Sequence, residues 1–146
     1  MEGVVEGAVQ GMAGGIAREF AWTGLVTLAA LFVYFWSALM VGRGRGLYKV
    51  PAPSMDGPPE FLRAVRVQIN TLEQIVLFLP ALWLFAAAWG DMAAALVGVF
   101  WPVGRILYAL AYYRDAKKRG PGFLIAMLPT LLLLLGALAG FVRVLL

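Results

Sequence analysis

The chain has 146 residues, of which 62% are hydrophobic and 14% charged, whereas a soluble domain has about 45–50% and about 25%. With a mean hydropathy of +0.85, so much apolar surface cannot be buried in a core of this size, which excludes a soluble enzyme, a disordered tail and a free nucleic-acid-binding protein. The net charge of +4 therefore indicates basic residues gathered at one membrane face, and no nucleic-acid partner is expected.

The first segment, residues 1–19, has glycine at every fourth position, namely Gly3, Gly7, Gly11 and Gly15. This spacing fits a close-packing helix face or an interfacial helix. Glycine also costs a helix about 1 kcal/mol relative to alanine. We therefore favour a loosely ordered N-terminal extension and expect one transmembrane domain over residues 20–146.

Four apolar segments follow, each long enough to cross a bilayer, for which about 20 residues suffice. They predict an all-α bundle of four transmembrane helices over about residues 20–42, 59–89, 92–117 and 121–145. Pro80, Pro102 and Pro129 lie inside three of these helices, and each is expected to kink its helix.

Basic residues gather in two segments, one between or near the ends of the first and second helices and one at the junction of the third and fourth. They are Arg43, Arg45, Lys49, Arg63, Arg66, Arg114, Lys117, Lys118 and Arg119. The positive-inside rule places both segments in the cytoplasm and both termini outside. The turn at Gly90 and Asp91 is short, so the second and third helices are expected to be antiparallel neighbours.

Two of the predicted helices carry a polar stripe near their cytoplasmic ends. At about 100° per residue, one side of the helix over 59–89 holds Arg63, Arg66, Asn70 and Glu73, while Gln68 falls on the opposite side. The stripe on the third helix consists of Arg105, Tyr108, Tyr112, Asp115 and Arg119.

Ionisable residues in a span usually face a cavity or one another. One interpretation of the stripes is therefore an interhelical ion pair, for example between Arg105 and Glu73. Because the arginines outnumber the two carboxylates of the stripes, the stripes as a whole favour the other interpretation, an anionic ligand.

The chain contains no cysteine and no histidine. Disulfides, a thiolate nucleophile, a histidine base and the usual zinc and haem sites are thereby excluded, and no metal is expected. If the protein is an enzyme, its nucleophile arrives with the substrate.

The string PPEFLRAVRVQINTLEQ, residues 58–74, has an R-x-x-R-x-Q-x-N-x-x-E core and resembles the second helix of the MAPEG family, the membrane-associated proteins of eicosanoid and glutathione metabolism. A second match is GRILYALAYYRDAKKRGP, residues 104–121. The likeness extends over most of residues 20–146. It implies homotrimers of four-helix subunits, with glutathione bound between neighbouring subunits near the cytoplasmic face. Small bacterial members resemble the microsomal glutathione transferases, which implies a location in the bacterial inner membrane.

The resemblance also implies which residues form the site. The expected glutathione contacts are Arg45, Arg66, Gln68, Asn70, Glu73, Tyr108 and Tyr112. Arg119 matches the arginine that stabilises the thiolate in the leukotriene-forming enzyme of the family, and with Tyr112 it forms the expected catalytic pair. Two positions depart from that enzyme's pattern: Gly46 replaces an arginine and Gln74 replaces a tyrosine contact.

The function implied is that of a membrane-bound glutathione transferase that joins glutathione to lipophilic electrophiles, as in detoxification, with glutathione-dependent peroxidase activity as a further reaction. Glutathione, the co-substrate, has two carboxylates that suit surplus arginines and a thiol that supplies the missing nucleophile. The other expected partners are the lipophilic electrophile, membrane lipid and further copies of the chain.

Two alternative functions stay open. One is a lipid-binding protein of the same fold without catalysis. The other is a small four-span transporter, which typically needs an acidic residue in its first helix, whereas residues 20–42 contain none.

Overall fold

The structure is a computed structural model that describes the backbone of residues 1–146 and every side chain except those of residues 2, 8, 10, 12 and 13. In chain order its helices are α1 (Glu2–Glu19), α2 (Ala21–Tyr48), α3 (Pro59–Trp89), α4 (Asp91–Gly98), α5 (Phe100–Arg114), the 3-10 helix η1 (Ala116–Arg119) and α6 (Gly120–Leu145). Among the residues described, four segments are long and apolar enough to cross a membrane: α2, α3, α4 with α5, and η1 with α6. The predicted all-α four-helix membrane bundle is thus confirmed.

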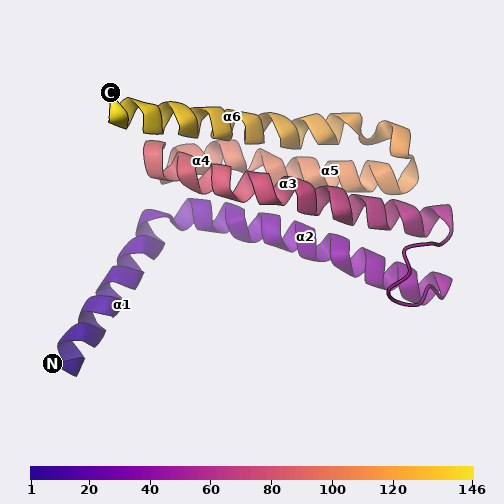
Figure 1. Ribbon diagram of the computed structural model, residues 1–146, viewed down its shortest axis with the longest axis horizontal. Helices are drawn as coiled ribbons and strands as arrows, with labels where there is room; N and C mark the ends of the chain where they lie inside the picture. Colours follow the sequence, from indigo (N-terminus) through magenta and orange to yellow (C-terminus); the bar gives the residue numbers. More distant parts are fainter.

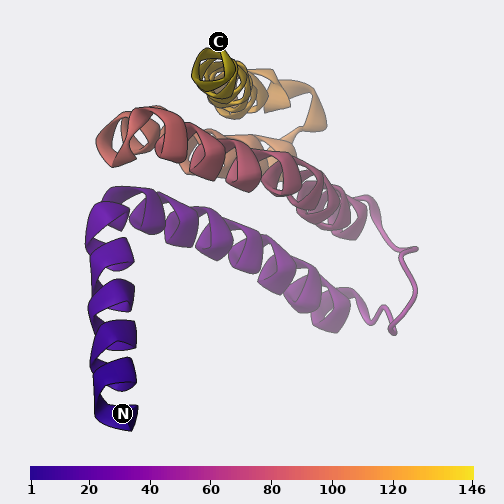
Figure 2. The same cartoon turned by 60° about the vertical axis from the view of Figure 1, so that its left-hand side comes forward.

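The four spans run side by side along the long axis of the molecule (Figure 1). Helix α3 lies between α2 and α6 (Figure 2) and packs against both. Helix α6 also packs along α5. Because α3 is the central helix, its buried side holds the bundle together, while its opposite side is left facing outward.

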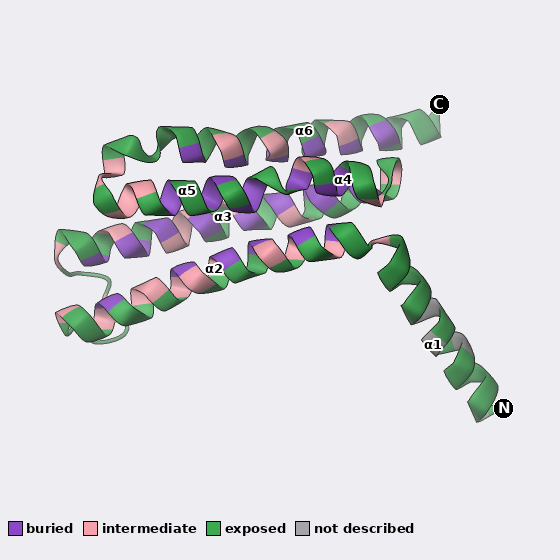
Figure 3. Cartoon of the chain, turned by 180° about the vertical axis from the view of Figure 1, so that it is seen from behind, coloured by how far each residue is buried: buried purple, intermediate pink, exposed green. Residues whose placement is uncertain are grey.

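Helix α1 projects away from the bundle (Figure 3), and its described side chains are exposed. The structure therefore has a helix where the sequence analysis favoured a loosely ordered extension. None of its described side chains belongs to the core clusters of the bundle, so α1 adds no packing that positions the polar stripes.

Helix α2 continues to Tyr48, beyond the predicted end near residue 42. The predicted end is the last residue before the first charged side chain, Arg43, but at the membrane interface arginine side chains extend into the headgroup region while the backbone stays helical. The helix stops where Lys49 adopts a left-handed conformation, with φ 55 and ψ 38, and its N–H donates to the carbonyl of Arg45.

The third span is divided at Val99 into α4 and α5, where the sequence predicted one kinked helix over 92–117. Pro102 has no N–H to donate to the carbonyl of Gly98, so the helical ladder is interrupted at this turn. The span also ends earlier than predicted, at Arg114, and η1 follows it. Helices α3 and α6 continue through Pro80 and Pro129.

Two glycines allow α5 and α6 to approach each other closely. A Cβ atom at Gly104 would lie 2.5 Å from the backbone nitrogen of Ala126, and one at Gly122 would lie within 3.0 Å of the backbone of Tyr108. Only glycine fits at such a contact. The close crossing fixes the position of α5 at Tyr108, one of the expected site residues.

Asp91 joins the start of α4 to the first turn of α2. Its carboxylate accepts hydrogen bonds from the backbone nitrogens of Trp22 at 3.0 Å and Thr23 at 2.6 Å. These donors belong to the first turn of α2, where backbone N–H groups have no partner within the helix and the helix dipole favours an anion. Asp91 thus caps α2 while it begins α4.

Candidate functional site

Three of the four expected contacts on α3 lie on its outward side. Arg66, Asn70 and Glu73 are separated by four and three residues, so they follow one another along a single helix face. Arg66 and Glu73 are exposed and Asn70 is half-buried. At 1.5 Å per residue, Glu73 lies roughly 24 Å along the helix from Trp89 and Arg66 roughly 35 Å, compared with a hydrocarbon core of about 30 Å. An exposed carboxylate at the depth of Glu73 indicates that this face does not meet lipid.

Tyrosines from α5 join this face. The buried Tyr108 donates its hydroxyl hydrogen to Oδ1 of Asn70 at 2.8 Å, and the rings of Tyr108 and Tyr112 lie 5.5 Å apart. Arg119, at the junction of η1 and α6, places its guanidinium carbon 5.5 Å from the Tyr112 ring. Asn70, Tyr108, Tyr112 and Arg119 therefore form a continuous series of contacts from mid-span to the end of the bundle.

Arg105 lies on the buried side of this series, against the ring of Tyr108. Its side chain is fully buried, its Nη2 donates to Oγ1 of Thr71 at 2.6 Å, and its guanidinium carbon lies 4.0 Å from the centre of the Tyr108 ring. The ion pair considered between Arg105 and Glu73 is not present. Among the described side chains, the salt bridge found joins Arg63 to Glu60 at 3.1 Å.

Two of the expected glutathione contacts point elsewhere. Gln68 is half-buried against α2, where its Nε2 donates to the hydroxyl of Tyr34 at 3.1 Å. Arg45 donates to the carbonyls of Ser54 at 2.7 Å and Pro51 at 3.3 Å, and so holds the loop between α2 and α3. Neither side chain is hydrogen-bonded to a member of the Asn70–Tyr108–Tyr112–Arg119 series.

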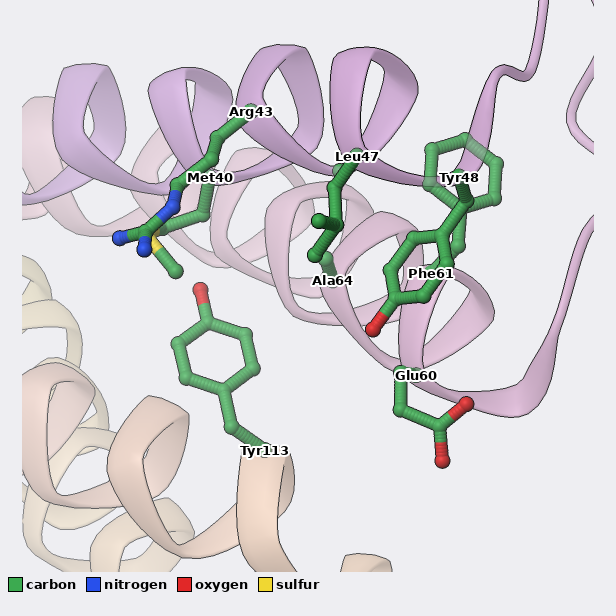
Figure 4. Close-up of a pocket in the computed structure, with 9 residues that line it drawn as sticks. Met40, Arg43, Leu47, Tyr48, Glu60, Phe61, Ala64 and Tyr113 are labelled. Carbon is green, nitrogen blue, oxygen red and sulfur yellow. The ribbon is translucent and has the colours of Figure 1, made fainter.

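A separate cavity of about 300 Å³ lies between α2, α3 and the end of α5. The residues that line it are Met40, Arg43, Gly44, Leu47, Tyr48, Glu60, Phe61, Ala64 and Tyr113 (Figure 4). Its α3 residues fall about 120–220° around the helix from Arg66, so this cavity faces away from the predicted glutathione face and includes none of the residues expected there.

The hydrogen bond between Arg105 and Thr71 does not follow from the predicted stripes. Arg105 belongs to the α5 stripe, but Thr71 lies about 140° from Arg66 around α3 and is therefore off the predicted stripe. A polar residue among apolar neighbours on the buried side of a span is the signal that identifies Thr71. No cluster of three or more Asp, Glu, His or Cys side chains suited to a metal occurs in the described part of the chain.

Comparison with known proteins decides the family. The model of the MAPEG family matches residues 23–139. This chain belongs to the MAPEG family. It is 45% identical to the uncharacterized protein sll1147 of Synechocystis over 82% of this chain and 88% of that one.

Two animal MAPEG proteins are also similar. Human microsomal glutathione S-transferase 2 is 40% identical, with 69% of each chain covered. Mouse leukotriene C4 synthase is 37% identical, with 69% of this chain and 67% of that one covered. Family membership and the four membrane-capable helices show that the protein is an integral membrane protein.

Proposed function

We propose that this MAPEG protein is a glutathione transferase that conjugates glutathione to lipophilic electrophiles entering from the membrane. Its relatives support a glutathione-related transferase activity at the level of the family. The observation that carries the proposal is the series Asn70–Tyr108–Tyr112–Arg119, which adjoins the α3 face bearing the exposed Arg66 and Glu73.

The charges on this face match those of glutathione. Arg66 is suited to a glutathione carboxylate and Glu73 to its ammonium group, because charge-assisted hydrogen bonds are about twice as strong as neutral ones. Asn70 already accepts from Tyr108 and keeps its amide N–H groups for a carboxylate or carbonyl of the ligand. The glutathione thiol then lies toward Tyr112 and Arg119.

Arg119 and Tyr112 have the chemistry to activate that thiol. A free thiol of this kind has a pKa of about 8.5 and is mostly protonated at neutral pH. A guanidinium nearby, or a hydroxyl that donates to the sulfur, favours the thiolate. The thiolate attacks the electrophilic carbon, a C–S bond forms, and the bond to the leaving group breaks while the thiol proton passes to solvent.

The active assembly in this proposal is a homotrimer with α3 nearest the axis. Arg66 and Glu73 would otherwise meet lipid, which is costly for charged groups. In this proposal Arg45 and Gln68, whose side chains are hydrogen-bonded away from the Asn70–Tyr108 pair of their own chain, contact glutathione held by a neighbouring subunit. Mass measurement in mild detergent tests this, since a stable monomer that still binds glutathione contradicts it.

The deciding experiment combines calorimetric titration of glutathione into the detergent-solubilised protein with turnover of an activated aryl chloride. Binding together with formation of the thioether supports the transferase. Lipid binding without either result supports the non-catalytic alternative. Reduction of a lipid hydroperoxide by glutathione tests the proposed peroxidase reaction in the same preparation.

The orientation follows from the charge distribution and is part of the proposal. The basic segments around residues 43–49 and 114–119 lie on the cytoplasmic side of a bacterial inner membrane, and both termini lie outside. This places the glutathione site near the cytoplasm, where glutathione is available. Labelling a single cysteine introduced at Lys118 with a membrane-impermeant reagent in intact cells tests the orientation, because a cytoplasmic residue stays unlabelled.

A further inference from the structure

Arg105 is a buried cation without a buried anion. The residue is fully buried within the third span, and two of its three guanidinium nitrogens, Nε and Nη1, have no hydrogen-bond partner among the described groups. Its one hydrogen bond is to a neutral hydroxyl, that of Thr71. Burying an unpaired charge is strongly unfavourable, and charged residues in a membrane normally have a partner.

Other unsatisfied groups share this layer of the bundle. The Nε1 of Trp101 and the Oε1 of Gln74 are also buried without a partner. Trp101 lies one turn before Arg105 on α5, and Gln74 lies on α3 between Thr71 and Phe78, whose ring stacks on Trp101 at 4.6 Å. The buried atoms without a partner are three donors, Nε and Nη1 of Arg105 and Nε1 of Trp101, one acceptor, Oε1 of Gln74, and the hydroxyl of Tyr113, which can donate or accept. Donors therefore outnumber acceptors among them, and one of the side chains is positively charged.

This excess charge lies next to the proposed site. The guanidinium of Arg105 is 4.0 Å from the centre of the Tyr108 ring, and the hydroxyl of Tyr108 is bonded to Asn70. One aromatic side chain therefore separates the buried cation from the face that would hold glutathione. In the proposed pose the thiol lies toward Tyr112, which is seven residues or roughly 10 Å along the helix from Arg105. A unit charge at that distance, at an effective dielectric constant of about 20, shifts an ionisation by roughly one pKa unit.

We propose that Arg105 is an electrostatic positioning residue whose unneutralised charge is balanced by the anionic form of bound glutathione. This inference rests on the proposed function and names a residue outside the expected contact set. Its consequence is reciprocal: Arg105 favours bound thiolate, and bound glutathione stabilises the buried Arg105. The ligand-free protein is correspondingly less stable than it would be with an apolar residue at this position.

The test uses the whole protein in detergent and compares Arg105→Met with Arg105→Lys. Methionine has a similar length without the charge, and lysine keeps a charge without the planar group. Arg143→Met is the matched control, because it removes one positive charge at the opposite end of the bundle. Three quantities are measured: the thermal midpoint without glutathione, its increase with saturating glutathione, and the pH at which bound thiolate absorbs in the ultraviolet.

We expect Arg105→Met to unfold at the same temperature as the wild type or higher when glutathione is absent. Its stabilisation by glutathione should be smaller, and its bound thiol should ionise at a pH about one unit higher, which is a tenfold loss of thiolate at any pH well below both pKa values. Because lysine keeps the positive charge, the bound thiol in Arg105→Lys should ionise close to the wild-type pH. Arg143→Met should leave the ionisation unchanged.

A purely structural role gives the opposite pattern. If Arg105→Met unfolds at a lower temperature, fails to fold, or keeps the wild-type thiol ionisation, the inference is wrong. Thr71→Val supplies a second criterion, because it removes the hydrogen bond to Nη2 but keeps the charge. A shift in thiol ionisation for Thr71→Val as large as that for Arg105→Met would mean that the hydrogen bond, rather than the charge, matters.

The same experiment separates this inference from the proposed function. Absence of glutathione binding to the wild type refutes the proposed function and the inference together. Wild-type binding with a lowered thiol pKa that Arg105→Met does not change refutes the role of Arg105 alone and leaves the transferase proposal in place.

Discussion

Replacing Gly122 with alanine should separate α5 from α6 at the level of Tyr108. The added methyl group would lie within 3.0 Å of both the backbone nitrogen and the Cα atom of Tyr108. Neither atom belongs to a flexible side chain, so the two helix backbones must move apart. Overpacking of this kind costs about 1–3 kcal/mol. For a chain of about this size each kcal/mol lowers the thermal midpoint by roughly 2–4 °C, so we expect a decrease of roughly 2–12 °C.

The same movement should weaken glutathione binding. Displacement of Tyr108 disturbs its 2.8 Å hydrogen bond to Asn70, which is worth about 0.5–1.5 kcal/mol net, or roughly a twofold to tenfold loss of affinity. The assay is thermal unfolding in detergent together with calorimetric titration of glutathione. Gly120→Ala is the matched control, because a Cβ atom at Gly120 meets nothing within 4 Å. If Gly122→Ala matches Gly120→Ala in both measurements, the close crossing does not position Tyr108.

Three further predictions concern single side chains. Arg119→Ala should lower turnover more than it weakens glutathione binding, and it should raise the pH at which thiolate absorbance at about 240 nm appears. The control Lys118→Ala, at an exposed neighbouring residue, should leave turnover, binding and this pH unchanged. Equal effects of the two variants would refute a specific role for Arg119. Arg66→Ala and Glu73→Ala should each weaken binding by roughly tenfold to a hundredfold, from about 1.5–3 kcal/mol for a charge-assisted contact, and unchanged calorimetric affinity in both would mean that the stripe binds no ligand. Asp91→Ala removes the acceptor for two backbone N–H groups at the start of α2. It should lower the free energy of unfolding by about 1–2 kcal/mol without altering glutathione affinity, and an unchanged thermal midpoint would contradict the capping role.

The helix faces could be predicted from the sequence because side-chain direction on a helix depends only on the spacing of residues. The spacing of Arg66, Asn70 and Glu73 predicted one face of α3, and the structure has them there. Contacts between residues of different helices do not follow from spacing alone, because they depend on how the helices cross. Tyr108 was predicted to share a site with Asn70 through the family resemblance, and the two side chains are hydrogen-bonded.

Local backbone details and tertiary partners were harder to predict. The kink expected at Pro102 became a division of the span at Val99, because the missing donor acts on a carbonyl one turn earlier. Arg45 was predicted as a ligand contact, whereas its guanidinium binds two loop carbonyls in this structure. An arginine has five N–H donors, and sequence spacing does not reveal which acceptors a folded loop will present to them.

The position of α3 links ligand binding to assembly. One side of this helix packs within the bundle through buried residues such as Phe61, Phe78 and Leu82, while Arg66 and Glu73 on the other side are exposed and not covered by a helix of the same chain. Because contact with lipid is costly for charged groups, glutathione, water and another subunit are the favourable partners for these two charges within the membrane. If a neighbouring subunit encloses the site, glutathione and that subunit contact the same face of α3. Each then covers charged groups of this face that the other leaves exposed, which lowers the free-energy cost of burying them. Binding of glutathione and formation of the trimer should therefore favour each other, because two ligands that stabilise one state are coupled reciprocally.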